Sequence, residues 1–180
     1  DNRVGFITEF ELFLSDVHHA FLKFDAESLK LLPISSDLDI AIDEKSLKDT
    51  IEFCKAHRYV KRCKLNQKSF MTTLELFFND GRFLSVDLIV DFRRKWVKFM
   101  NIKELLHFSN RKKLGFYVPS LEHDIEYTLM FYILNGAQVP EKYIDLFTNT
   151  LRENQIRALR YFQKKYDLEF SSIRDLLSSF

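Results

Sequence analysis

The segment spanning residues 69–90 constrains the fold most strongly, because it carries the pattern of two strands joined by a tight turn. Residues 69–78 and 82–90 are rich in β-branched and aromatic side chains, and Asn79-Asp80-Gly81 separates them. Such a turn between two strand-like runs is typical of a β-hairpin. The second run alternates cleanly between two faces, with Leu84, Val86, Leu88 and Val90 on one of them. We therefore predict a sheet built around this hairpin.

The residues before the hairpin alternate between helical and strand-like patterns. Thr8 followed by Glu11 is a capping-box signature, and apolar residues then recur at helical spacing, which predicts a helix over 8–24. Asp43 is a suitable N-cap for a second helix over 44–57. Short strands are expected at residues 29–34, 37–42 and 59–65.

Beyond residue 100 the pattern becomes mainly helical. A short helix is predicted at 102–108, then a loop with an edge segment at 110–120. Four further helices are expected: 121–135 closed by Gly136, Pro140 to 148, one capped by Thr150 and Glu153 to about 166, and a short one from Ser172. We predict an α/β (α+β) fold, with a mixed α/β core in residues 1–100 and a helical part in 101–180 packed on that core.

Composition narrows the possible partners. The chain has 180 residues, 46% of them hydrophobic, with 27 basic and 26 acidic side chains. This balance gives no argument for binding nucleic acid or an anionic membrane, and no apolar run is long enough to span a bilayer. Cys54 and Cys63 lack metal-ligand spacing, so we expect reduced thiols and a cytoplasmic location. The first residue is Asp1 rather than Met, which indicates a fragment or a trimmed chain.

Three acidic residues are the strongest candidates for a functional site. Asp37 and Asp39 lie two positions apart in an otherwise apolar strand, so both point to the same face. A buried carboxylate pair needs a metal, a basic partner or water. Asp87 lies in the middle of the second hairpin strand, and Asp91, on the same face, is the alternative third acid. If the strands are neighbours, the acids would converge as a two-Mg²⁺ site for phosphoryl or nucleotidyl transfer requires.

Two segments together resemble a known family. Residues 35–42, Ser-Ser-Asp-Leu-Asp-Ile-Ala-Ile followed by a helix, and residues 84–90, Leu-Ser-Val-Asp-Leu-Ile-Val, are similar to the nucleotidyltransferase superfamily that includes polymerase beta and the small bacterial nucleotidyltransferases. The resemblance covers roughly residues 8–95 and implies a small mixed sheet with helices packed on one side, followed by a helical part. It implies that Asp37 and Asp39 are the catalytic, metal-binding pair, that Asp87 is the third acid, and that Mg²⁺ is the cofactor. It also implies transfer of a nucleoside monophosphate from a nucleoside triphosphate to a hydroxyl or phosphate acceptor.

The chain departs from that family at the turn that holds the triphosphate. The family has a Gly-Ser turn, whereas this chain has no glycine between Gly5 and Gly81. Ser35 and Ser36 precede the acids, and we expect their hydroxyl and N–H groups to contact the phosphates. The departure leaves two alternatives open: a non-catalytic binding or regulatory domain of the same fold, and an unrelated α+β interaction domain. The sequence specifies neither the acceptor, nor the nucleotide base, nor the oligomeric state.

Other charged groups are weaker candidates. We expect the basic clusters to be solvated surface; they comprise Lys61, Arg62 and Lys64, then Arg93, Arg94 and Lys95, then Arg111, Lys112 and Lys113. His18 and His19 are adjacent on the predicted first helix and cannot face one site together. Glu126, near the start of a helix, is an alternative substrate-facing residue.

Overall fold

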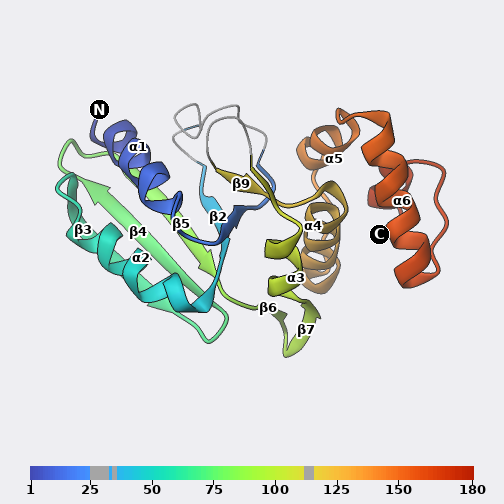
Figure 1. The fold of residues 1–180 in the computed structure, drawn as a ribbon, viewed down its shortest axis with the longest axis horizontal. Helices are drawn as coiled ribbons and strands as arrows, with labels where there is room; N and C mark the ends of the chain where they lie inside the picture. The colour runs from blue at the N-terminus through green and yellow to red at the C-terminus, as the bar shows by residue number, and fades with distance from the viewer. Residues whose placement is uncertain (25–32, 34–35, 112–115) are drawn as a thin grey trace. The chain divides into compact units, whose positions relative to one another are not determined.

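The computed structural model describes residues 1–24, 33, 36–111 and 116–180. The fold is mixed α/β with a helical C-terminal part, as predicted (Figure 1). The helices are α1 (Asn2–Leu14), α2 (Glu44–Ala56), α3 (Ile102–His107), α4 (Leu121–Asn135), α5 (Glu141–Thr148), α6 (Arg152–Tyr166) and α7 (Ile173–Ser178). The main-sheet strands are β1 (His19–Phe21), β2 (Leu38–Ile42), β3 (Val60–Gln67), β4 (Met71–Phe78) and β5 (Phe83–Ile89).

The five strands form one sheet in the order β1-β2-β5-β4-β3. The predicted hairpin is confirmed, because β4 and β5 pair antiparallel around a turn in which Gly81 has a φ of 82°. β1 pairs antiparallel with β2, and β2 pairs parallel with β5. This last pairing brings together two segments that lie almost fifty positions apart in the chain.

One face of the sheet is covered by α1 and α2 (Figure 1). The inward side chains of the strands, among them Ile40, Leu76 and Val86, pack there against Phe6 and Phe10 of α1. Each fully buried aromatic or aliphatic side chain of this kind contributes about 1.5–3 kcal/mol of transfer free energy. Because alternate strand residues face opposite ways, Asp39 and Asp87 lie on the other face.

The helix predicted over residues 8–24 was wrong at both ends. The helix begins at Asn2, because the Asp1 side chain caps it by accepting a hydrogen bond from the Val4 backbone N–H. It ends at Leu14, and the chain enters β1 a few residues later. Phe21 matched the helical spacing, yet it is a buried strand residue that packs in the same core as α1.

Most other predicted elements are confirmed to within a few residues. Asp43 caps α2 by accepting a hydrogen bond from the Lys45 N–H, and Gly136 closes α4 in the left-handed conformation with a φ of 67°. Ser172 caps α7, whereas α6 begins after Leu151 and has no side-chain cap at Thr150. The strand predicted at residues 29–34 lies outside the described residues, except for Pro33.

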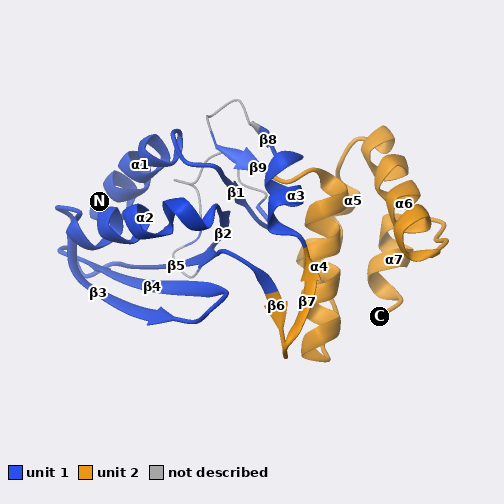
Figure 2. Cartoon of the chain, turned by 60° about the horizontal axis from the view of Figure 1, so that its bottom comes forward, with its two compact units in different colours: residues 1–92, 101–118 blue, residues 93–100, 119–180 orange. Residues whose placement is uncertain are grey.

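The chain divides into two compact units, each made of two segments (Figure 2). One contains residues 1–92 and 101–118, and the other contains 93–100 and 119–180. The prediction had a single division at residue 100. The second unit includes most of an unpredicted hairpin, β6 (Phe92–Arg94) and β7 (Val97–Met100). The first unit also holds the short pair β8 (Asn110–Arg111) and β9 (Tyr117–Val118).

The helical unit has its own core and a buried polar cluster. Its apolar side chains include Ile125, Leu129, Ile144, Phe147, Phe162 and Leu176. Glu126 of α4 is fully buried, and its carboxylate accepts hydrogen bonds from the Tyr161 and Tyr166 hydroxyls and lies 2.8 Å from Lys165 Nζ. These contacts connect α4 to α6. Among the described helices, none combines the length and apolar character that crossing a membrane requires.

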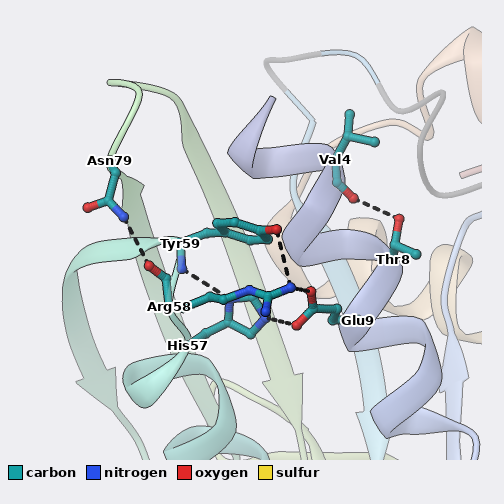
Figure 3. Close-up of polar contacts among 7 residues, drawn as sticks. All are labelled: Val4, Thr8, Glu9, His57, Arg58, Tyr59 and Asn79. Atoms are coloured by element: carbon teal, nitrogen blue, oxygen red, sulfur yellow. Dashed lines mark hydrogen bonds and ion pairs between the residues drawn. The ribbon is translucent and has the colours of Figure 1, made fainter.

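A second polar cluster connects α1 to the segment after α2 (Figure 3). His57 Nε2 lies 3.1 Å from Glu9 Oε2, and Arg58 forms an ion pair with the other carboxylate oxygen of Glu9. The His57 ring is almost fully buried, with Phe6 and Phe53 against it. Burial lowers the pKa of His57, and the Glu9 carboxylate acts in the opposite direction. Burial also lowers the pKa of His19.

From the lowered pKa values of these two histidines we predict that the folded protein loses stability in mild acid. Their folded-state pKa values lie below the unfolded value of about 6.5, so the unfolded chain binds protons first as the pH falls. The free energy of unfolding should be highest above that value and decrease between about pH 7.5 and pH 5. His57→Gln should make this decrease smaller, as measured by urea denaturation across that range.

His107→Gln is the matched control, because His107 is exposed in α3. It should leave the pH dependence as in the wild type. A decrease that His57→Gln left unaltered would contradict a pKa of His57 that burial lowers.

Candidate metal centre

The parallel pairing of β2 with β5 places the predicted acids side by side. Asp39 is the register partner of Asp87, with Leu38 opposite Val86 and Ile40 opposite Leu88 on either side of them. Paired residues on neighbouring strands point to the same face, about 5 Å apart. Asp37 lies two residues before Asp39 and therefore shares that face.

The three carboxylates form a compact cluster. One oxygen from each of Asp37, Asp39 and Asp87 lies within 4.8 Å of the others. Asp37 is exposed, while Asp39 and Asp87 are half-buried. This is the one such group of three potential metal ligands found among the described residues. The sequence-predicted set is thus brought together, although its members come from strands far apart in the chain.

Asp87 is the most constrained of the three. Burial raises the pKa of its carboxyl above the ordinary value, and the negative charges of Asp39 and Asp37 raise it further. A hydrogen bond from Thr73, its cross-strand partner on β4, and the charge of Lys23 act in the opposite direction. Its Oδ1 atom is buried and accepts no hydrogen bond from any described residue. A buried carboxylate oxygen without a donor is costly, and a cation would relieve that cost.

Sequence analysis missed Lys23, which joins the cluster from the end of β1. Its Nζ lies 2.5 Å from Asp39 Oδ2, and both side chains are largely buried, at 10% and 18% exposure. The Leu22 N–H donates to the Asp39 carbonyl, which fixes this stretch beside β2. Lys23 was placed in the wrongly predicted first helix, and no local pattern marks a contact between residues 23 and 39.

The structure describes only some of the remaining predicted site residues. Ser35 lies outside the described residues, and the Ser36 N–H donates to the Pro33 carbonyl 3.0 Å away. Asp91, the alternative third acid, follows β5 and does not belong to the cluster. The predicted phosphate-binding role of Ser35 and Ser36 therefore stays a prediction.

The weaker candidates have structural partners elsewhere. Lys64 pairs with Glu75 across β3 and β4, and Arg94 Nε donates to Asn135 Oδ1 in the helical unit. His19 is a buried strand residue rather than a helix residue. Glu126 is enclosed by tyrosines and a lysine, as described above. Lys112 and Lys113 lie outside the described residues.

Comparison with family models, with curated proteins and with solved structures returned no match to this chain. The geometry of the cluster therefore carries the functional argument.

The donor set fits a hard divalent cation. Carboxylate oxygens are the ligands that Mg²⁺ prefers, and Mg²⁺ usually keeps several waters besides one or two carboxylates. Asp37 is exposed, so the cluster is open to solvent and to a ligand on that side. The buried Oδ1 of Asp87, which accepts no hydrogen bond from the part of the chain that the structure describes, provides an independent reason to test for a cation at this place.

Asp87→Asn should stabilise the metal-free protein. When folding raises the pKa of a carboxyl, the protonated group favours the folded state at pH values below its pKa in the unfolded chain. This contribution to stability is lost as the pH rises through the pKa of the folded state. At neutral pH the ionised group is therefore unfavourable, and the amide should raise the free energy of unfolding by an amount on the order of 1 kcal/mol. Thermal and urea denaturation in a chelator at about pH 7.5 would measure it.

Addition of millimolar Mg²⁺ should stabilise the wild type and leave Asp87→Asn almost unchanged, because only a folded site binds the ion. Asp49→Asn, the same change at an exposed position of α2, serves as the control. It should alter neither the stability of the metal-free protein nor the stabilisation by Mg²⁺. A metal-free Asp87→Asn protein less stable than the wild type would contradict this account of the site.

Proposed function

We propose that the protein is a Mg²⁺-dependent nucleotidyltransferase. It would move a nucleoside monophosphate from a nucleoside triphosphate to a hydroxyl or phosphate acceptor. The supporting observation is the convergence of Asp37, Asp39 and Asp87 within 4.8 Å, on the sheet face opposite the core. An Asp-x-Asp pair with a third acid on a neighbouring strand is the arrangement implied by the resemblance to the nucleotidyltransferase superfamily.

The proposed roles follow from position. Asp37 and Asp39 would hold Mg²⁺, and Asp87 would complete the ligand set. Bound Mg²⁺ supplies Lewis-acid polarisation and orients the attacking and leaving oxygens for in-line displacement. Asp87 would also accept the proton of the acceptor hydroxyl while the hydroxyl oxygen forms a bond to the α-phosphorus. The bond between the α-phosphorus and the oxygen that bridges it to the β-phosphorus would break, and pyrophosphate would leave.

The surrounding strands hold these groups in place. Asp39 and Asp87 lie opposite each other on paired strands whose other face is anchored in the core, and Thr73 of β4 forms a hydrogen bond with the Asp87 carboxyl. Catalytic groups positioned by a packed scaffold lose little free energy to reorganisation during the reaction.

The third alternative, an unrelated interaction domain, would be favoured by acids lying more than about 10 Å apart, since no shared two-metal site could then form.

A second candidate function is a non-catalytic domain of the same fold. The ion pair between Lys23 and Asp39 favours it, because an internal ammonium already neutralises one of the acids. The absence of glycine between Gly5 and Gly81 favours it as well. Such a domain would bind neither Mg²⁺ nor a nucleoside triphosphate.

Calorimetric titration with Mg²⁺ and each of the four nucleoside triphosphates distinguishes the two functions. We expect binding of at least one triphosphate that requires the metal. Asp39→Asn should weaken it on the order of a hundredfold or more, since even outer-sphere changes at metal sites cost about 10–100-fold.

Asp49→Asn again provides the matched control and should bind as the wild type does. Failure of every triphosphate to bind, with no Mg²⁺-dependent difference in stability between the wild type and the Asp37→Asn and Asp87→Asn proteins, would favour the non-catalytic domain.

A further inference from the structure

Lys23 lies beside the acid cluster in a backbone conformation that is unusual for a lysine. Lys23 lies two residues beyond Phe21, the last β1 residue paired with β2, and adopts a φ of 52°, in the left-handed region that favours glycine. Its ammonium is nonetheless directed to the acid cluster and lies 2.5 Å from Asp39 Oδ2. Just beyond the end of β1, a lysine in the left-handed backbone conformation thus lies beside the acid cluster. The neighbouring strand, β2, carries Asp39.

The ammonium contributes to the charge of the site. Three carboxylates and one ammonium leave a formal charge of two negatives in the metal-free protein, which favours the approach of a divalent cation. The lysine pairs with one of the two carboxylate oxygens of Asp39, so a metal bound to Asp39 would compete with it for that carboxylate. Both side chains are largely buried, and attraction between charges is screened less there than at the surface.

A metal at Asp39 would bring phosphate close to this lysine. Mg²⁺ binds its ligands at 2.0–2.1 Å in an octahedron, so two adjacent ligand oxygens lie about 3 Å apart. A phosphate oxygen on the same ion would therefore lie within a few ångströms of the Lys23 ammonium. The lysine stem is flexible and its ammonium has three donors, so it can change partners with a small movement.

We propose that Lys23 is a positioning residue with two alternating partners: the Asp39 carboxylate in the metal-free protein, and the phosphates of the nucleoside triphosphate in the loaded protein. This inference rests on the proposed function. Lys23 offsets part of the negative charge of the metal-free acid cluster, and it supplies to the phosphates the cationic contact that substitutes for the backbone N–H groups of a glycine turn.

The proposal predicts opposite effects of one substitution on two ligands. Lys23→Met keeps most of the side-chain stem and removes the charge. Mg²⁺ alone should bind this variant about tenfold more tightly than the wild type, because the competing ammonium is gone. A non-hydrolysable triphosphate analogue, titrated at saturating Mg²⁺, should bind about tenfold more weakly, because a charge-assisted contact is lost.

Three further variants make the comparison specific. Lys48→Met removes a lysine exposed on α2 and should change neither affinity. Lys23→Arg retains the charge and should retain more of the analogue affinity than Lys23→Met. Lys23→Gln provides the same test as Lys23→Met with a polar side chain, for the case in which the methionine variant does not fold. All affinities are measured by calorimetry on the full chain.

The outcomes separate this inference from the proposed function. Opposite shifts in the two affinities support it. Metal and analogue binding that Lys23→Met and Lys23→Gln both leave unchanged overturns the role of Lys23 and leaves the proposed function intact. Absence of metal and analogue binding in the wild type and in every Lys23 variant overturns both.

Discussion

The parallel pairing of β2 with β5 is the interaction on which the candidate site depends. Of the four described pairings in the main sheet, three are antiparallel and this one is parallel. It sets Asp39 opposite Asp87, and a shift of the register by one residue would turn one of these acids into the core. The correct register is favoured because Leu38, Ile40 and Ile42 are buried together with Val86 and Leu88, so the same alignment that fills the core also assembles the acids.

Concentrating three carboxylates on one sheet face is electrostatically unfavourable, and the structure offsets that cost in two ways. The opposite face packs against α1 and α2 through a continuous apolar core. The ammonium of Lys23 lies against Asp39 inside the cluster. The buried oxygen of Asp87 still has no donor among the described residues. This arrangement is the basis for proposing a cation at the cluster.

Local patterns predicted the elements that depend on neighbouring residues, and they failed where a contact is distant in sequence. The hairpin around Gly81 and the faces of Asp39 and Asp87 followed from strand alternation. The predicted first helix ran through Phe21, because the spacing of Phe21 from the preceding apolar residues fits a helix. Phe21 is instead a strand residue that packs in the same core as α1, so the spacing did not distinguish the two structures. That error hid Lys23, whose partner depends on the pairing of β1 with β2. The β6-β7 hairpin was missed because its turn uses Lys95 and Trp96, both with positive φ, rather than glycine or asparagine.

The central claim is that Asp37, Asp39 and Asp87 together bind a divalent cation. The most direct test is anomalous diffraction from crystals grown with Mn²⁺, which replaces Mg²⁺ at oxygen-rich sites and scatters anomalously. The account predicts an anomalous peak between β2 and β5, within about 2.3 Å of oxygens from Asp39 and Asp87, with Lys23 displaced from Asp39. Ordered crystals with no peak at this position, and with Lys23 still paired to Asp39 at millimolar Mn²⁺, would contradict it.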